Sequence, residues 1–260
     1  MSENCKQSKR NAMNPILLGK TAIVTGASRG IGKAIAVRLG AMGSSVVVNY
    51  ANNDAAAEST VKEVETNGGK ALAIQADMRR VGEIESLFEQ TISTFGAVHI
   101  LVNNAGIALF KSIESFTEAD FDNLFTANVK GVFFACQMAA KKMSDGGRII
   151  NISSSVTRAL LPRYGGYAAT KGAVNQITRV LAKELGSKGI TVNAISPGPT
   201  DTELFRKGKT RQQIEGFAQA TALGRIGLPG DIADAVGLLV SDEAGWINGQ
   251  NILVNGGFIA

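Results

Sequence analysis

Histidine and cysteine are scarce in this chain of 260 residues. The one histidine, His99, precedes an apolar run typical of a buried strand, which excludes a Ser-His-Asp triad and most zinc or iron sites. The two cysteines, Cys5 and Cys136, lie far apart in the sequence, one among polar and one among apolar residues. We therefore expect no disulfide framework, no metal centre, and a reducing compartment such as the cytoplasm.

Long apolar runs and blocks of like charge are also absent. No segment approaches the roughly 18 apolar residues that suggest a transmembrane helix, and no signal peptide is recognisable. The 27 Lys and Arg against 22 Asp and Glu give a net charge of +5, scattered along the chain. These features predict a protein that binds neither membrane nor nucleic acid.

Short β-branched runs alternate with longer segments of helical period from Lys20 onward, a pattern typical of βαβ units. We predict strands at residues 21–25, 45–50, 71–75, 98–102, 148–152, 191–195 and 251–254. We predict helices at 31–42, 55–67, 81–95, 118–143, 166–186 and 231–241. The expected fold class is α/β: one Rossmann-type domain over residues 19–260, with a doubly wound, parallel, seven-stranded sheet and helices on both faces. Residues 1–18 are expected to form a disordered or weakly packed tail, with Met13 as an alternative start.

The first predicted strand leads into a glycine-rich turn. Glycines permit a tight turn and a close approach of backbone to a pyrophosphate. The helix that begins within the turn offers free N–H groups and a positive dipole end to phosphates. The turn therefore predicts a dinucleotide site, although any tight strand-to-helix turn could use such a sequence. The residues predicted to bind there are Gly26, Ser28, Arg29, Gly30, Ile31 and Gly32.

The end of the second strand predicts which dinucleotide binds. An acidic residue there would accept hydrogen bonds from the ribose hydroxyl of NAD and repel the 2′-phosphate of NADP. The strand instead ends in Asn49 and Tyr50, which are predicted to contact the cofactor, and the first acid is Asp54. Arg29 is placed to meet a 2′-phosphate, and Ser28 to add a hydrogen bond. We predict NADPH in preference to NADH; the alternative is that Arg29 is a solvated turn residue.

Two further segments follow predicted strands. Asp77 and Met78 come just after the third strand, where Asp77 could hydrogen-bond an adenine amino group. The small and amide residues Asn104, Ala105 and Gly106 follow the fourth strand and suit close packing against an adenosine. Each segment alone could equally be an ordinary loop.

Tyr167 and Lys171 are four residues apart in a predicted helix, so both side chains project from one face. A nearby cation favours the phenolate and brings a weak acid closer to working pH. An unremarkable surface pair is the alternative. Tyr164 provides an internal contrast, because its own i+4 position is Ala168.

The chain resembles the short-chain dehydrogenase/reductase family over residues 19–260. The family's glycine turn matches Gly26, Gly30 and Gly32, its NNAG motif matches Asn103 to Gly106, and its YxxxK motif matches Tyr167 and Lys171. The resemblance also assigns a catalytic role to Ser154 and Asn128 and cofactor contacts to Pro197, Gly198, Thr200 and Thr202. Within the family, the chain is closest in look to 3-oxoacyl-[acyl-carrier-protein] reductase-like ketoreductases.

The resemblance implies a mechanism for reducing a carbonyl. Tyr167 would protonate the carbonyl oxygen, Ser154 would hydrogen-bond it, and Lys171 would bind the nicotinamide ribose and tune Tyr167. Asn128 would hold a water that links Lys171 to solvent. The expected partners are a small carbonyl substrate, free or linked to a carrier protein or CoA, and three further copies of the chain in a homotetramer.

Residues 202–220 are predicted to form a lid over the substrate. The segment combines apolar and basic side chains, which suits an acyl or aromatic ketone carrying an anionic group. Its residues of interest are Leu204, Phe205, Arg206, Lys207, Lys209, Arg211 and Phe217. Two other functions remain open: a family dehydrogenase that oxidises an alcohol, sugar or steroid, and a non-catalytic nucleotide-binding protein.

Overall fold

The computed structural model describes residues 16–260, and in these one parallel sheet contains seven strands. The strand order is β3-β2-β1-β4-β5-β6-β7. This confirms the predicted fold class. The bounds are β1 Thr21–Val24, β2 Ser45–Tyr50, β3 Lys70–Gln75, β4 Ile100–Asn103, β5 Arg148–Ile152, β6 Thr191–Pro197 and β7 Asn251–Val254.

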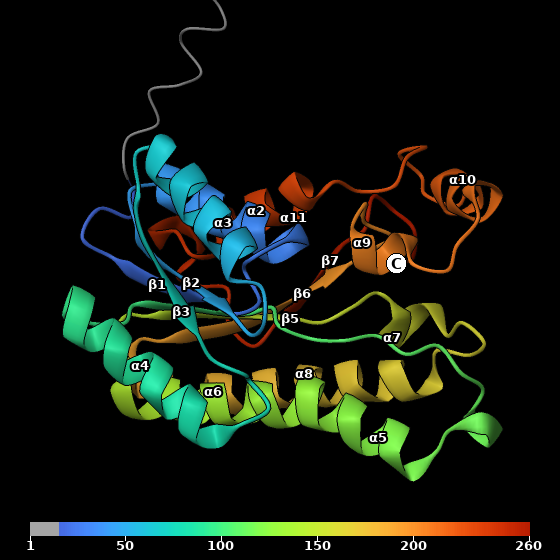
Figure 1. The fold of residues 1–260 in the computed structure, drawn as a ribbon, viewed down its shortest axis with the longest axis horizontal. Coiled ribbons are helices and arrows are strands. Elements are labelled where there is room, and N and C mark those ends of the chain that lie inside the picture. Colours follow the sequence, from blue (N-terminus) through green and yellow to red (C-terminus); the bar gives the residue numbers. More distant parts are fainter. Residues whose placement is uncertain (1–15) are drawn as a thin grey trace, which may run out of the picture.

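Helices cover both faces of the sheet (Figure 1). On one face pack α2 (Gly30–Ala41), α3 (Asp54–Thr66) and α11 (Pro229–Leu239). On the other pack α4 (Val81–Phe95), α6 (Gly131–Lys142) and α8 (Gly165–Glu184). Shorter helices lie at one end of the sheet: α5 (Glu118–Phe125), α7 (Val156–Ala159), α9 (Glu203–Arg206) and α10 (Arg211–Gln219).

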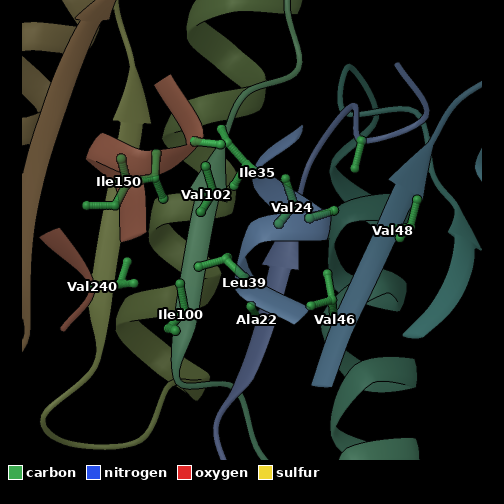
Figure 2. Close-up of a cluster of buried hydrophobic side chains, with 14 of the residues drawn as sticks. Ala22, Val24, Ile35, Leu39, Val46, Val48, Ile100, Val102, Ile150 and Val240 are labelled. Atoms are coloured by element: carbon green, nitrogen blue, oxygen red, sulfur yellow. The ribbon is translucent and has the colours of Figure 1, made fainter. Parts of the chain in front are cut away.

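Successive side chains of each central strand point to opposite faces of the sheet and belong to two separate hydrophobic cores. In β1, Ala22 and Val24 belong to the core beneath α2, whereas Ile23 belongs to the core beneath α4 and α6. Figure 2 shows the first core, where Ile35 and Leu39 of α2 point onto the strands. Because both faces are buried, the strands read as continuous apolar runs.

Chain order reverses between β1 and β4, and this places the functional cleft. Strands β2 and β3 extend from β1 to one side, and β4 to β7 extend to the other. The connections that leave the carboxyl ends of β1 and β4 therefore diverge to opposite faces, and a crevice opens between them.

Three predicted segments differ from the structure. The single helix expected over residues 118–143 is helical throughout residues 118–142, but within it residues 126–130 form a wider π turn between α5 and α6. The region after β6 contains two short helices, α9 and α10, that the apolar period did not resolve. The predicted tail over residues 1–18 falls mostly outside the described residues, as does Met13; within its described part, Leu17 is buried and its N–H donates to Met42 O.

Candidate active site

The glycine turn between β1 and α2 is shaped by the absence of side chains. Gly26 and Gly30 have φ angles of +63° and +56°, in the left-handed region that favours glycine. At Gly32 a Cβ atom would lie 2.4 Å from Asn104 Nδ2 and 2.4 Å from Gly26 O. The turn thus packs directly against the residues that follow β4.

Polar side chains at the carboxyl ends of three strands, or just after them, fix this turn. Thr25 Oγ1 accepts hydrogen bonds from the N–H groups of Asn104 and Ala105, at 2.9 and 3.0 Å. Asn104 Nδ2 donates to Thr25 O, and Gly26 N donates to Asn49 Oδ1. Sequence reasoning missed Thr25, whose position at the end of β1 was the available signal.

Asn49 is placed differently from its predicted role. It is 1% exposed, and its amide nitrogen donates to the carbonyl oxygens of Ile74 and Ala76. Its oxygen is occupied by the Gly26 N–H. Asn49 therefore holds the turn and β3 together, and we expect any part it plays in cofactor binding to be indirect.

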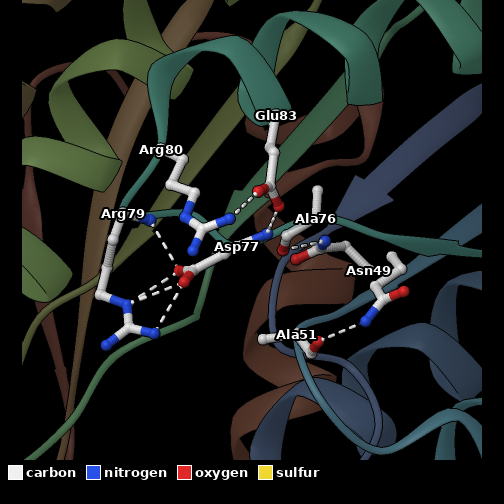
Figure 3. A network of polar contacts seen from close by, with 8 residues as sticks. Asn49, Ala51, Ala76, Asp77, Arg79, Arg80 and Glu83 are labelled. Carbon is white, nitrogen blue, oxygen red and sulfur yellow. Dashed lines mark hydrogen bonds and ion pairs between the residues drawn. The ribbon is translucent and has the colours of Figure 1, made fainter.

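Asp77 lies in a network of charged groups (Figure 3). Arg79 Nε donates to Asp77 Oδ1 at 2.9 Å, and this pairing holds the pKa of the Asp77 carboxyl below its usual range. The Asp77 N–H donates to Glu83, which also accepts from Arg80. Met78 is buried, with its carbonyl against Gly131.

Arg29 reaches across the turn to the region after β6. Its guanidinium is 3.1 Å from Glu203 Oε2, and both side chains are mostly exposed. Ser28 lies beside it and contributes a carbonyl to Thr60. Tyr50 donates its hydroxyl proton to Asp54 at 2.5 Å, so the first acid after β2 is already hydrogen-bonded.

Ser154, Tyr167 and Lys171 meet where β5 ends and α8 begins. Burial raises the pKa of Tyr167 to about 12, and a hydrogen bond with Ser154 opposes that rise. Burial lowers the pKa of Lys171 to about 8. Its Nζ donates to Ile152 O at 2.8 Å and lies 5.8 Å from the Tyr167 ring centroid. Burial, rather than the charge of Lys171, therefore determines the direction in which the pKa of the Tyr167 phenol shifts. The phenol is protonated at neutral pH.

Asn128 lies in the π turn and is completely buried. Its side-chain oxygen accepts from Ile107 N, and its nitrogen donates to Ile107 O, both at 2.8 Å. The nitrogen also donates to Thr170 Oγ1, and the Thr170 hydroxyl donates in turn to the backbone carbonyl oxygen of Tyr167. Asn128 thus ties the loop after β4 to the helix that bears Tyr167.

The segment after β6 passes close to the same site. A Cβ atom at Gly198 would lie 2.7 Å from Asn255 Cβ, so the backbones approach closely there. Thr200 Oγ1 donates to Gly198 O. Thr202 Oγ1 accepts from Phe205 N and caps α9.

A cleft of about 940 Å³, counting its open mouth, joins these parts. Its predicted lining residues are Ile31, Asn104, Gly106, Ser154, Tyr167, Lys171, Pro197, Gly198, Thr200 and Thr202. The other predicted site residues do not line it: Gly26, Ser28, Arg29, Gly30, Gly32, Asn49, Tyr50, Asp77, Met78, Ala105 and Asn128. Sequence reasoning missed several aromatic and apolar wall residues: Ile107, Phe110, Leu161, Tyr164 and Phe258.

The segment predicted as a lid contributes Leu204, Phe205, Lys209 and Phe217 to the wall of this cleft, but its cations do not form a continuous basic rim. Arg206 Nη2 is 2.8 Å from Asp201 Oδ2, and Arg211 Nε is 2.8 Å from Glu215 Oε1. Lys207 is exposed and does not line the cleft, whereas Lys209 does.

Comparison with known proteins agrees with this arrangement. A family model described as enoyl-(acyl carrier protein) reductase matches residues 26–259. A short chain dehydrogenase/reductase, nsrJ, from Aspergillus novofumigatus is 43% identical over 253 residues, covering 92% of this chain and 95% of the relative.

Solved structures are similar over nearly the whole chain. A short chain dehydrogenase from Burkholderia cenocepacia in complex with NADP has a TM-score of 0.89 and 37% identity, over 94% of this chain and 99% of the other. The angucycline C-6 ketoreductase LanV, with bound NADP, has a TM-score of 0.89 and 40% identity, over 95% and 98%.

The fold and the site define an oxidoreductase that uses a nicotinamide cofactor. The chain belongs to the short-chain dehydrogenase/reductase family. Its own geometry fits a dinucleotide, because the turn at Gly32 has no room for a side chain and the cleft runs from α2 to Tyr167.

Proposed function

We propose that this protein reduces a ketone to a secondary alcohol with NADPH, and that Tyr167 donates the proton. The observation that carries the proposal is the meeting of Ser154, Tyr167 and Lys171 on one wall of a mainly apolar cleft. When bound, the cofactor supplies a hydride to the carbonyl carbon. The substrate is a 3-oxoacyl thioester or a related carbonyl compound.

Tyr167 and Ser154 divide the work at the carbonyl oxygen. The pKa of about 12 keeps the Tyr167 phenol protonated, which is the form that can give a proton to an oxygen gaining negative charge. Ser154 is already hydrogen-bonded to that phenol, so one hydroxyl can orient both the phenol and the substrate oxygen. Charge is thereby neutralised as it develops.

Lys171 has two roles in the proposal. Its ammonium donates a hydrogen bond to Ile152 O and lies near Gly106. Its other two N–H groups could donate hydrogen bonds to the hydroxyl groups of a ribose. Its positive charge stabilises the phenolate left after proton donation. Asn128 fixes the surrounding loop through its hydrogen bonds with Ile107. A water held near Asn128 would form hydrogen bonds with polar groups that these bonds leave available.

The preference for NADPH rests on charge near the glycine turn. Arg29 is exposed at the start of α2, and the first acid after β2 is engaged by Tyr50. A 2′-phosphate would therefore be attracted by the Arg29 guanidinium, and no free carboxylate at the end of β2 would repel it. We place the enzyme in the cytoplasm, where the buried Cys136 thiol stays reduced.

Replacement of Tyr167 tests the proposal. Tyr167→Phe removes the donated proton and is expected to lower kcat about 10²- to 10⁴-fold. NADPH binding, followed by fluorescence of the bound nicotinamide, is expected to stay near the wild-type value. Tyr164→Phe alters the other phenol of the cleft and is expected to change KM rather than kcat. Near-normal kcat in Tyr167→Phe would contradict the assignment.

A further inference from the structure

Aromatic side chains form the part of the cleft away from Ser154. Phe110 packs on Tyr164 with ring centroids 4.3 Å apart, and its centroid is 6.1 Å from that of Tyr167. On the lid side, Phe205 and Phe217 are 5.5 Å apart in an edge-to-face arrangement. Two aromatic walls thus face the space in which a substrate would lie, and flat rings fit between such walls.

Lys209 lies between these walls. Its Nζ is 5.0 Å from the centroid of Phe110 and 4.8 Å from that of Phe205, so both rings contact the cation. Nζ donates one hydrogen bond, to Phe205 O at 2.7 Å. An ammonium group has three protons, so two remain for a ligand.

The backbone around Lys209 is fixed by its neighbours. Gly208 has φ +72°, a left-handed conformation that reverses the chain between α9 and α10. Thr210 then caps α10 by accepting from Gln213 N, and Gln213 bonds back to Thr210 N. The lysine is therefore held at a defined turn rather than on a free loop.

The charges around the cleft single out Lys209. The described residues that line the cleft include two cations, Lys171 and Lys209, and no carboxylate. Lys171 belongs to the catalytic group. Burial lowers the pKa of Lys209 below its ordinary value, and an anion seated against it would offset that cost.

We propose that Lys209 binds an anionic oxygen of the substrate, and that the substrate is an aromatic ketone carrying a carboxylate or an ionised phenol. The aromatic walls take the rings, and Lys209 sets the orientation that brings the ketone to Tyr167. This inference rests on the proposed function and adds the class of substrate to it.

The size of the cleft agrees with such a ligand. Phe110 bridges Tyr167 and Lys209, so the ammonium is no farther from the Tyr167 ring than the two distances through Phe110 laid end to end. A ketone with fused aromatic rings can span that distance while its rings lie among the aromatic side chains of the cleft.

Equilibrium binding tests the role of Lys209 without turnover. Titration of 2-naphthoate and of neutral 2-naphthamide into the protein with NADP+ is expected to show tighter binding of the carboxylate, by about tenfold. Lys209→Met keeps an unbranched apolar side chain, removes the ammonium, and should abolish this difference. Lys207→Met, two residues away and outside the cleft, should preserve it. Equal affinities in the wild type, or a difference that survives in Lys209→Met, would overturn the inference.

Turnover separates this inference from the proposed function. With a carboxylated tetralone and its methyl ester as substrates, Lys209→Met should raise the ratio of KM for the acid to KM for the ester by about tenfold. If the wild type reduces neither these ketones nor an acetoacetyl thioester but binds 2-naphthoate through Lys209, the proposed function fails and the anion site stands. If both ketones are reduced with equal KM, the anion site fails and the reductase stands.

Discussion

Tyr167 and Lys171 lie on one turn of α8, and the same burial shifts their pKa values in opposite directions. The phenol titrates at about 12 and the ammonium at about 8, so each is displaced toward its neutral form. Tyr167 therefore keeps its proton across the physiological range. Lys171 is charged at neutral pH at a cost in folding free energy.

The cost of burying Lys171 makes stability depend on pH. Because its folded pKa of about 8 lies below its unfolded pKa, the unfolded state binds more protons between these values, and stability rises with pH there. From pH 7.5 to 9.5 this contributes about 2 kcal/mol to the free energy of unfolding. The thiol of Cys136 and the phenol of Tyr167 act in the opposite sense at higher pH, because burial raises their pKa values.

Lys171→Met isolates this contribution. Urea unfolding at both pH values should show a difference, wild type minus variant, that increases by about 2 kcal/mol at the higher pH. Cys136 and Tyr167 are common to both proteins, so their effects cancel. A pH-independent difference would mean that Lys171 is not buried as a charge.

Glu203 competes for the side chain that we expect to bind the 2′-phosphate. Arg29 pairs with Glu203 in the structure, and both side chains are exposed, so the pair itself is weak. Glu203→Gln should free Arg29 and tighten NADPH binding by a few-fold, less than about tenfold, without tightening NADH. Competitive titration of both cofactors measures this. An equal change in affinity for both cofactors would contradict the binding of the 2′-phosphate by Arg29.

Motif residues of the site were predictable because their spacing carries the chemistry. Tyr167, Lys171 and Ser154 do meet in space, and the cleft includes them. Asn49 could not be placed correctly, because its sequence position at a strand end does not show that its amide is used up by Gly26, Ile74 and Ala76. The aromatic wall was missed for a related reason: Phe110 meets Tyr164 only through the tertiary fold.

At the scale of elements, the strands were located within a few residues because buried parallel strands are short, β-branched runs. The long helix over residues 118–143 was only partly right, since its apolar period continues through the π turn that places Asn128. A one-residue widening leaves little trace in hydrophobic periodicity, and π turns often occur at functional sites. The short helices α9 and α10 were missed because few of their residues are buried.

The first turn of α2 gives a test at this scale. Gly32→Ala would place Cβ 2.4 Å from Asn104 Nδ2, so the turn must shift, with an expected loss of about 1–3 kcal/mol and weaker NADPH binding. Gly82→Ala in α4 meets no atom within 4 Å and should leave stability unchanged or raise it by up to about 1 kcal/mol. Thermal unfolding and cofactor titration compare them. Equal Tm values would contradict the tight packing of α2 on Asn104.

At the scale of the whole molecule, the parallel sheet brings together residues from distant parts of the chain. Ile31, Ser154 and Thr202 follow three different strands, and all line one cleft. No helix among residues 16–260 is long and apolar enough to cross a membrane. In the same residues, no group of three His, Cys, Asp or Glu side chains could hold a metal ion.

Exposed apolar side chains on two sides of the molecule support the homotetramer, which we propose as the state in solution. Phe133 of α6 and Val180 of α8 are 51% and 56% exposed, and Trp246 beside β7 is 99% exposed. Large apolar side chains such as these become buried when a second subunit packs against them. Light scattering should give four times the mass of one chain. Phe133→Glu should lower that mass, whereas Lys62→Glu on the opposite face should not; a monomeric wild type would contradict the proposal.

The most direct test of the central claim is the initial rate of cofactor oxidation, with NADPH and NADH in parallel, against an acetoacetyl thioester, a cyclic diketone and a carboxylated tetralone. We predict ketone-dependent oxidation with kcat/KM at least about tenfold higher for NADPH, since only NADPH presents a 2′-phosphate to Arg29. The absence of ketone-dependent oxidation, or a preference for NADH, would contradict the account.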